Sequence, residues 1–495
     1  MVENRSIWQQ DWLARWALYR PEKAALQEHE GNRMITYRDL NALANGMASF
    51  LNSKLGVKKG DRVVVIAEYS ITLVALWGAA QKLGFALVPL NYRLAAPEIK
   101  EISEDADPVL IFYENHFIHL LPETENIPAY EMQVLAEVSA LEDFDVHAVE
   151  EDDSLFIIYT SGTTGKPKGV RYTHKMAFWN SINTALSLSL SSENRTVNVM
   201  PPFHTGGWNV LLLPFLHHGG FTYLFKKFEA DQVLAKLEEM KCNIFMGVPT
   251  MLAMMAQDEH FADTDLHNLD YIIVGGESMP VPLIEKYAAK GVAIRQGYGM
   301  TEVGPNLTSL HQDDAIRKIG SIGRPNFYVQ HRIVKEDGAD AGANEAGELW
   351  LRGPVVTPGY WNNAEAGKNA FSEDGLWFKT GDIVKEDEEK YLYIVDRLKN
   401  MYISGAENVY PAEIERVLKQ NENIKECAVV GVKDEKWGEV GKAFVVLHNP
   451  MDEAELKAFC IERLAKFKIP KYFIILNELP LTDSGKIDRK KLKQP

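Results

Sequence analysis

The stretch Tyr159 to Gly169 reads Y-T-S-G-T-T-G-K-P-K-G and is rich in glycine, hydroxyl and lysine residues. It combines three glycines, four Ser or Thr hydroxyls and two lysines. Glycines let the backbone turn with positive φ and bring N–H groups close to an anion, while the hydroxyls and lysines add donors and positive charge. The apolar run at 155–158 just before it predicts a buried strand. We therefore expect a strand that ends in a polyphosphate-binding loop.

Two other kinds of loop are rich in the same residue types. A Walker A loop requires the spacing G-x-x-x-x-G-K-[ST], which is absent, and Pro167 follows Lys166 where a Ser or Thr would open a helix. A flexible glycine-serine loop explains the glycines but not the two lysines framed by them. Phosphate binding accounts for both.

Outward from the loop, predicted strands alternate with helices over the first two-thirds of the chain. Strand-like runs lie at 62–67, 85–89, 109–112, 196–200, 222–225, 244–247 and 271–274, and residues 71–83 are typical of a helix. Such alternation predicts an α/β body of mixed sheets flanked by helices. From about Gly320, strand-like runs at 328–334, 348–352 and 391–395 indicate a small β-rich subdomain that completes the body.

The last hundred residues show a pattern of their own. A helix is predicted near 412–420, strands at 426–432 and 443–448, and a helix at 453–467. The polar run Asp396-Arg397-Leu398-Lys399-Asn400 separates them from the body. We therefore expect an N-terminal domain at 1–395, a hinge at 396–397 and a small mobile α+β domain at 398–495.

The bulk composition limits the partners. The chain has 495 residues and a formal net charge of −16, which argues against nucleic acid or an anionic membrane as the main partner. No apolar run is long enough to span a bilayer. Cys242, Cys427 and Cys460 are far apart without metal-like spacing, which fits buried thiols in a reduced, cytoplasmic compartment. The sequence leaves a homodimer open.

Further motifs stand at the predicted ends of elements, where α/β proteins bind ligands. Gly275-Gly276-Glu277-Ser278 follows a strand and is, taken alone, also compatible with a plain turn. Gln296 to Glu302 reads Q-G-Y-G-M-T-E and lacks the third glycine of a dinucleotide fingerprint. Tyr298 offers a flat face for a base, and Glu302 a hard oxygen for Mg²⁺. Two further motifs complete this group: Thr380-Gly381-Asp382, and Ser484-Gly485-Lys486 with its single lysine.

In order and spacing, these motifs resemble those of the acyl-adenylate-forming enzymes: acyl-CoA synthetases, luciferases and the adenylation domains of peptide synthetases. The resemblance spans essentially the whole chain. It implies ATP, Mg²⁺ and coenzyme A as cofactors, with Lys486, Thr301, Glu302 and His204 as catalytic residues and Glu302 as the metal ligand. The implied ATP- and AMP-binding residues are Thr160, Ser161, Gly162, Thr163, Thr164, Gly165, Lys166, Lys168, Gly276, Glu277, Gly297, Tyr298, Gly299, Asp382 and Arg397.

The resemblance also implies a two-step reaction. A carboxylate attacks the α-phosphorus of ATP, and a thiol then displaces AMP after the small domain rotates about Asp396. The residues implied on the CoA side are Ser404, Gly405, Ala406, Trp437 and Arg93, and Ala406 stands where many relatives carry a second glycine. A basic cluster at Arg463, Lys466, Lys468 and Lys471 suits either the CoA phosphates or a solvated helix face.

The acid is expected to be hydrophobic. Its pocket residues, by the same resemblance, are Trp208, Met246, Gly247, Val248, Gly275, Gly299 and Met300. His204 follows Phe203 where amino-acid-activating relatives carry an aspartate, so a fatty or aryl acid is favoured over an amino acid. The expected activity is an AMP-forming acyl-CoA synthetase. Alternatives left open are transfer to a carrier protein or an amine, a nucleotide-binding regulator without turnover, and a P-loop kinase or ATPase.

Overall fold

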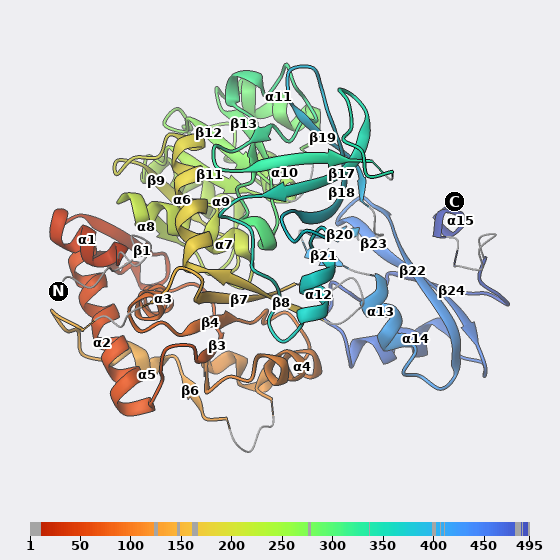
Figure 1. Cartoon of the computed structure of the whole chain (residues 1–495), viewed down its shortest axis with the longest axis horizontal. Coiled ribbons are helices and arrows are strands. Elements are labelled where there is room, and N and C mark those ends of the chain that lie inside the picture. Colours follow the sequence, from red (N-terminus) through yellow and green to blue (C-terminus); the bar gives the residue numbers. More distant parts are fainter. Residues whose placement is uncertain are drawn as a thin grey trace.

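The computed structural model describes residues 11–122, 127–145, 149–160, 167–275, 279–335, 337–397, 402–405, 407–409, 411–480, 487 and 489–493. Within them the strands form five sheets, and helices pack against the sheets of the body (Figure 1). None of the described helices is both long enough and apolar enough to cross a lipid bilayer. The mixed α/β fold expected from the sequence is confirmed, with a small C-terminal part that contains its own sheet.

The first sheet contains the strand that leads into the glycine-rich loop. Its order is β6-β5-β3-β4-β7-β8, and all its neighbours are parallel except the β7–β8 hairpin. Its strands are β3 (Arg62–Ile66), β4 (Ala86–Pro89), β5 (Leu110–Tyr113), β6 (Ala129–Glu131), β7 (Ser154–Thr160) and β8 (Lys168–Thr173). Both faces of β3 are buried, which is why it reads as an unbroken apolar run.

Two further sheets complete the α/β part of the body. One has the order β2-β1-β10-β9, with β1 (Ala24–Glu28), β2 (Met34–Thr36), β9 (Arg195–Asn198) and β10 (Phe221–Leu224). The other has the order β11-β12-β13-β14-β15, with β11 (Ile244–Gly247), β12 (Tyr271–Val274), β13 (Ala293–Tyr298), β14 (Thr308–Ser309) and β15 (Arg324–Pro325). The strands β11, β12 and β13 are parallel, so their carboxyl ends meet at one edge.

The remaining sheets are antiparallel for the most part. The fourth sheet comprises β16 (Gln330–Val334), β17 (Ala346–Arg352), β18 (Phe378–Glu386) and β19 (Leu392–Arg397). The fifth comprises β20 (Tyr402–Ser404), β21 (Glu407–Val409), β22 (Ile424–Asp434), β23 (Gly438–Leu447) and β24 (Tyr472–Ile475). The predicted hinge at 396–397 therefore falls at the end of the fourth sheet, just before the fifth begins.

The helices flank these sheets. They are α1 (Trp12–Tyr19), α2 (Tyr37–Leu55), α3 (Ile71–Leu83), α4 (Ala96–Ala106), α5 (Gln133–Ala136), α6 (His174–Leu188), α7 (Thr205–Asn209), α8 (Leu212–His218), α9 (Ala230–Glu239), α10 (Pro249–Gln257), α11 (Val281–Ala289), α12 (Ala364–Asn369), α13 (Pro411–Leu418), α14 (Glu453–Ile461) and α15 (Arg489–Leu492). Ser70 caps α3 through a bond from Leu73 N–H, and Gly84 ends it in a left-handed conformation.

One predicted helix is shorter than expected. The run at 453–467 forms a helix only as far as Ile461. Beyond it the chain turns so that the backbone N–H of Ala465 donates to Glu98 Oε2 in α4, at 3.0 Å. The chain beyond α14 is therefore held by a hydrogen bond to the body, and local helix propensity cannot predict such a bond.

Candidate active site

The two ends of the glycine-rich stretch lie in β7 and β8, which form an antiparallel hairpin. Thr160 at the end of β7 lies opposite Lys168 at the start of β8 in the antiparallel register. Residues 161–166, which include Ser161, Gly162, Thr163, Thr164, Gly165 and Lys166, lie outside the described part of the chain. The hairpin places both ends of the predicted phosphate loop at the carboxyl end of β7, the edge where α/β folds bind nucleotides.

Two of the predicted motifs meet at the end of β13. The hydroxyl of Tyr298 donates to Asp382 Oδ2 at 2.5 Å, across a separation of 84 residues. Asp382 in turn lies opposite Arg397 in the β18–β19 register. A Cβ on Gly299, next to Tyr298, would lie 2.0 Å from the carbonyl oxygen of Pro305, so only glycine fits there. The fold thus gathers the predicted nucleotide-binding residues Tyr298, Asp382 and Arg397 at one place.

Glu302 is a buried carboxylate beside them. It is 7% exposed, and its Oε1 accepts a bond from the hydroxyl of Tyr360 at 3.0 Å. Burial raises the pKa of Glu302, against the opposing effects of hydrogen bonds and the Lys168 charge. The Lys168 ammonium lies 5.2 Å from the centre of the Tyr360 ring. A buried carboxylate oxygen is a hard ligand of the kind that a divalent metal such as Mg²⁺ prefers. Tyr360 was not predicted, because no motif marks it.

A second cluster joins the body to the C-terminal part. His204 Nε2 lies 2.8 Å from Glu407 Oε2, and the Arg93 guanidinium pairs with the other carboxylate oxygen. Glu407 is only 4% exposed, although it follows a tight turn. Burial alone would raise the pKa of Glu407, but the charges of His204 and Arg93 outweigh it and hold that pKa below its usual value. His204 and Arg93 thus share the buried carboxylate of Glu407, and the three residues come from distant segments of the chain.

The predicted CoA side borders this cluster. Gly405 donates its N–H to the carbonyl of Trp437 at 3.0 Å, and a Cβ on Gly405 would lie 2.8 Å from the Trp437 ring. Ser404 is buried, Trp437 is 47% exposed, and Ala406 lies outside the described residues. Trp437 therefore packs against Gly405, which lies two residues before Glu407 in the chain.

Two members of the basic cluster predicted for the CoA phosphates, Lys468 and Lys471, lie in different surroundings. Lys468 is 5% exposed, and its ammonium contacts Glu98 at 2.8 Å and Glu413 at 2.5 Å. Burial alone would lower the pKa of Lys468, but the two carboxylates raise it, so the lysine stays charged. Lys471 pairs with Asp434 on the surface. Lys468 is therefore committed to an ion pair inside the protein and does not offer its charge to a ligand.

The predicted acid-binding residues do not all face the same side. Met246, Val248 and Met200 pack in one apolar cluster on the face of β11 that α7 covers. Trp208 is fully buried, donates to the carbonyl of Pro202, and packs against Tyr69 and Phe156 in the body core. Trp208 therefore packs in a different apolar cluster from Met246, and its place in the acid pocket stays a prediction.

Gly247 faces away from the pocket. A Cβ on Gly247 would lie 2.5 Å from Leu252 Cδ1, on the face of β11 that α10 covers. Successive residues of a strand point to opposite faces, so Gly247 cannot share the Met246 side. Gly275 and Met300 are half-buried near the strand ends. Gly276, Glu277 and Lys486 lie outside the described residues.

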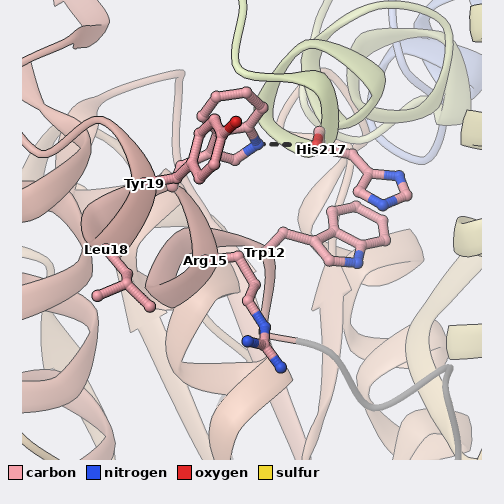
Figure 2. A pocket seen from close by; sticks show the side chains of 6 residues that line it. Trp12, Arg15, Leu18, Tyr19 and His217 are labelled. Atoms are coloured by element: carbon pink, nitrogen blue, oxygen red, sulfur yellow. Dashed lines mark hydrogen bonds between the residues drawn. The ribbon is translucent and has the colours of Figure 1, made fainter.

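A hollow elsewhere on the molecule is not part of this site. It is lined by Trp12, Arg15, Trp16, Leu18, Tyr19 and His217 (Figure 2). Trp12 stacks on His217 with ring centres 4.2 Å apart, and Trp16 donates to the His217 carbonyl at 2.9 Å. These contacts attach α1 to α8. None of the residues that line the hollow belongs to the predicted site.

Comparison with known proteins identifies relatives of the whole chain. A family model described as AMP-binding enzyme matches residues 13–361, and its companion, AMP-binding enzyme C-terminal domain, matches residues 413–486. The long-chain-fatty-acid–CoA ligase FadD13 of Mycobacterium tuberculosis is 37% identical to this chain, and the alignment covers 98% of the chain and 97% of that protein.

Two solved structures of o-succinylbenzoate CoA synthetase (MenE) from Bacillus subtilis are also similar, each at 32% identity. A double mutant bound with its product analogue OSB-NCoA gives a TM-score of 0.89, with 97% of each chain covered. The complex with ATP and magnesium ion gives 0.72, with 98% and 99% covered. The backbone of the present chain is therefore more similar to the product-analogue complex than to the complex with ATP.

Proposed function

The chain belongs to the AMP-binding enzyme family. From this membership we propose which of its residues act in each of the two reaction steps. It is an AMP-forming acid–thiol ligase, which activates a fatty or aryl carboxylic acid with ATP and Mg²⁺ and transfers the acyl group to coenzyme A.

The first step brings together two anions. An acid is already ionised at neutral pH, so no general base is required. The barrier lies in electrostatic repulsion, alignment and the charge that develops on pyrophosphate. We assign the hairpin tip between Thr160 and Lys168 to the β- and γ-phosphates, Thr301 to the α-phosphate, and Asp382 with Arg397 to the ribose. Lys486 is the cation that we expect to contact both reactants.

The ring of Tyr298 is assigned to the adenine. Its hydroxyl is tied to Asp382 at 2.5 Å, which fixes the orientation of the ring relative to the ribose-binding carboxylate. Glu302 would hold Mg²⁺, which screens the phosphate charge when bound. Its burial and its hydroxyl donor Tyr360 hold the carboxylate in place beside the hairpin.

The second step requires access for a thiol. We propose that the described arrangement is the one in which the thioester forms. The observation that carries this proposal is the 2.8 Å contact of His204 Nε2 with Glu407 Oε2. His204 lies on the body at the start of α7, and Glu407 lies on the C-terminal part, so this contact exists only while the two parts are docked as described. The similarity to the product-analogue complex supports the same assignment.

In this arrangement His204 is drawn toward the C-terminal part. Glu407 is held ionised by His204 and Arg93, so it keeps the imidazole on its side of the cluster. We propose that this position of His204 leaves a path from Trp437 and Gly405 to the acyl group. Rotation about Asp396 would break the contact and let Lys486 reach the ATP for the first step.

The test is a pyrophosphate-release assay with fatty, aryl and small carboxylic acids, run with and without CoA. We expect pyrophosphate and AMP with a subset of acids, and an acyl-CoA only when CoA is present. Parallel reactions with a holo-carrier protein and with simple amines separate the alternative acceptors. Production of ADP would contradict the proposal in favour of a kinase or ATPase, and absence of pyrophosphate with every acid would favour a regulator without turnover.

We also propose a cytoplasmic enzyme. Cys242, Cys427 and Cys460 are all free and buried, as expected for a protein made in a reducing compartment. A homodimer remains our proposal for its association state. Sedimentation of the purified full-length chain at several concentrations tests it, and a single monomeric species throughout would refute it.

A further inference from the structure

Met246, Ile273 and Arg295 lie side by side near the carboxyl ends of β11, β12 and β13. We propose that these three residues form the floor of the acid-binding pocket, and that the enzyme therefore selects single-ring or medium-chain acids over long-chain acids. This inference rests on the proposed function, because it assumes that the acid enters between α7 and the carboxyl ends of β11, β12 and β13. The relatives' names leave the question open, since they include both a long-chain fatty acid and succinylbenzoate.

The register of the sheet identifies the floor. Met246, Ile273 and Arg295 are direct neighbours across β11, β12 and β13. Met246 and Ile273 belong to the apolar cluster on the α7 face, whereas Phe245, Ile272 and Ile294 belong to the cluster on the opposite face. Gly275 and Gly297, two residues further along, mark the pocket mouth. The row therefore lies about 6.6 Å below the mouth, at ~3.3 Å per residue of parallel strand.

The exposed fraction of the residues falls at the depth of this row. Gly275 and Gly297 are half-buried at the mouth. Met246 is 9% exposed and Ile273 is 7% exposed, which indicates that solvent just reaches this row. Ile244, one strand repeat deeper than Met246, is 1% exposed. The accessible space therefore ends at the row of Met246 and Ile273.

Met246 also closes the gap toward the helix. An added Cβ on Gly206 in α7 would lie 3.5 Å from Met246 Cε, which is ordinary van der Waals contact. The Met246 side chain thus spans the whole distance from β11 to the α7 backbone. A Met side chain has three rotatable bonds and no branch, so it yields to small changes in ligand shape but still occupies the space.

The β13 side of the floor is closed by a polar bridge. Arg295 is 4% exposed, and its Nη2 donates to the carbonyl of Ser187 at the end of α6, at 2.9 Å. Tyr271 donates to the neighbouring Leu188 carbonyl at 2.5 Å, and its ring centre lies 4.8 Å from the Arg295 guanidinium carbon. Helix α6 is thereby fastened to the sheet below the pocket. A long acyl chain could pass this bridge only by breaking buried hydrogen bonds, which leaves buried polar groups without partners.

The experiment measures kcat/KM for pyrophosphate release with butyrate, hexanoate, octanoate, laurate, palmitate, benzoate and phenylacetate. For the wild-type enzyme we expect kcat/KM to be highest with hexanoate, benzoate or phenylacetate. We expect it to be about 10-fold or more lower with laurate and palmitate, since a packed site takes extra methylene groups only with strain. Equal use of palmitate and hexanoate would overturn the proposed floor and leave the ligase activity standing. No pyrophosphate with any acid would instead contradict the proposed function.

The Met246→Ala variant opens the floor and should improve laurate relative to hexanoate by about 10-fold. Its matched control is Met255→Ala, which also truncates a buried methionine but lies on the opposite face of the sheet, in α10. The control should leave the order of acids unchanged, and an identical change in both variants would contradict the inference.

A variant that tests the same floor without making a cavity is Gly206→Ala. Its new methyl group would touch Met246 and narrow the pocket, so we expect kcat/KM for octanoate to fall relative to butyrate. Circular dichroism establishes that each variant is folded before its profile is compared. A Gly206→Ala profile identical to that of the wild type would refute a pocket bounded by Met246.

Discussion

At the scale of single residues, the site depends on a few charged groups whose neighbours decide their state. Glu407 shows this best, because its sequence neighbourhood is that of a surface turn while the structure buries it between His204 and Arg93. Desolvation of a carboxylate is costly, and the ion pairs offset that cost only while the C-terminal part is docked. One residue can therefore couple the position of a domain to the geometry of the reacting groups.

We predict that Glu407→Gln separates the two half-reactions. Loss of a charged hydrogen bond typically costs about 1.5–3 kcal/mol, so transfer of the acyl group from supplied acyl-AMP to CoA should slow about 10- to 100-fold. Acid-dependent exchange of pyrophosphate into ATP should change much less. Single-turnover measurements of both half-reactions check this. An equal loss in both would show that Glu407 does not act on the second step in particular.

Lys486 is expected to have the opposite effect. The Lys486→Ala variant removes the cation assigned to the reacting anions, and loss of such a group typically costs ~10²–10³ in rate or more. We expect adenylation to fall by at least that factor while thioester formation from supplied acyl-AMP is largely retained. Lys491→Ala, a neighbouring lysine outside the motif, serves as control. If the transfer step falls as much as adenylation, the assigned division of labour is wrong.

At the scale of elements, α6 connects the end of β8 to the sheet that contains β12 and β13. Its first residue, His174, follows the N-cap Thr173 and is buried, and its last turn is tied to Arg295 and Tyr271. Burial lowers the pKa of His174 to about 4, although the charge of Asp153 opposes the shift. The helix N-terminus also disfavours a positive charge there. The helix therefore folds around a neutral imidazole.

This predicts a pH-dependent stability. The unfolded histidine has a pKa near 6.5, above its value of about 4 in the folded state, so the unfolded chain binds the proton more readily. The stabilisation from a neutral His174 is complete above about pH 6.5 and is lost as the pH falls toward 4. Lowering the pH from 7.5 to 5 should cost about 2 kcal/mol at this residue.

Denaturant unfolding at the two pH values measures the effect. The His174→Gln variant should lose less stability on acidification than the wild type, because its side chain does not titrate. His260→Gln, at an exposed position, is the control and should behave like the wild type. An unchanged pH dependence in His174→Gln would contradict the proposed origin.

At the scale of the whole molecule, the described arrangement is held by contacts between two parts of the chain. Besides the Glu407 cluster, Glu98 in α4 accepts bonds from Ala465 N–H and from the Lys468 ammonium, while Lys468 also contacts Glu413. In Figure 1, α4 lies at the edge of the body, and α14 of the C-terminal part lies to its right in blue. Glu98 therefore supplies the body's half of an ion pair that exists only in this docking.

We predict that Glu98→Gln weakens the docked arrangement. Lys468 keeps Glu413 but loses one of its two carboxylates, and the transfer of acyl groups to CoA should slow severalfold while adenylation is unchanged or faster. The matched control is Glu104→Gln, on the same helix but exposed and 3.9 Å from Lys100. Small-angle scattering should show a shifted distribution of shapes for Glu98→Gln alone. No difference between the two variants would rule out a role of this pair in docking.

Residue order alone determined the α/β class, most strand positions, and the family with its ATP-dependent chemistry. These depend on local periodicity and on motifs that are contiguous in the chain, such as the β7–β8 loop and the run around Tyr298. The tertiary structure alone decided which way Trp208 and Gly247 face and where α14 ends. It also decided the partners of Tyr360, Glu407 and Glu98, which lie between 58 and 370 residues away along the chain. The reason is physical: burial and ion pairing depend on distances that folding creates, and no local pattern encodes them.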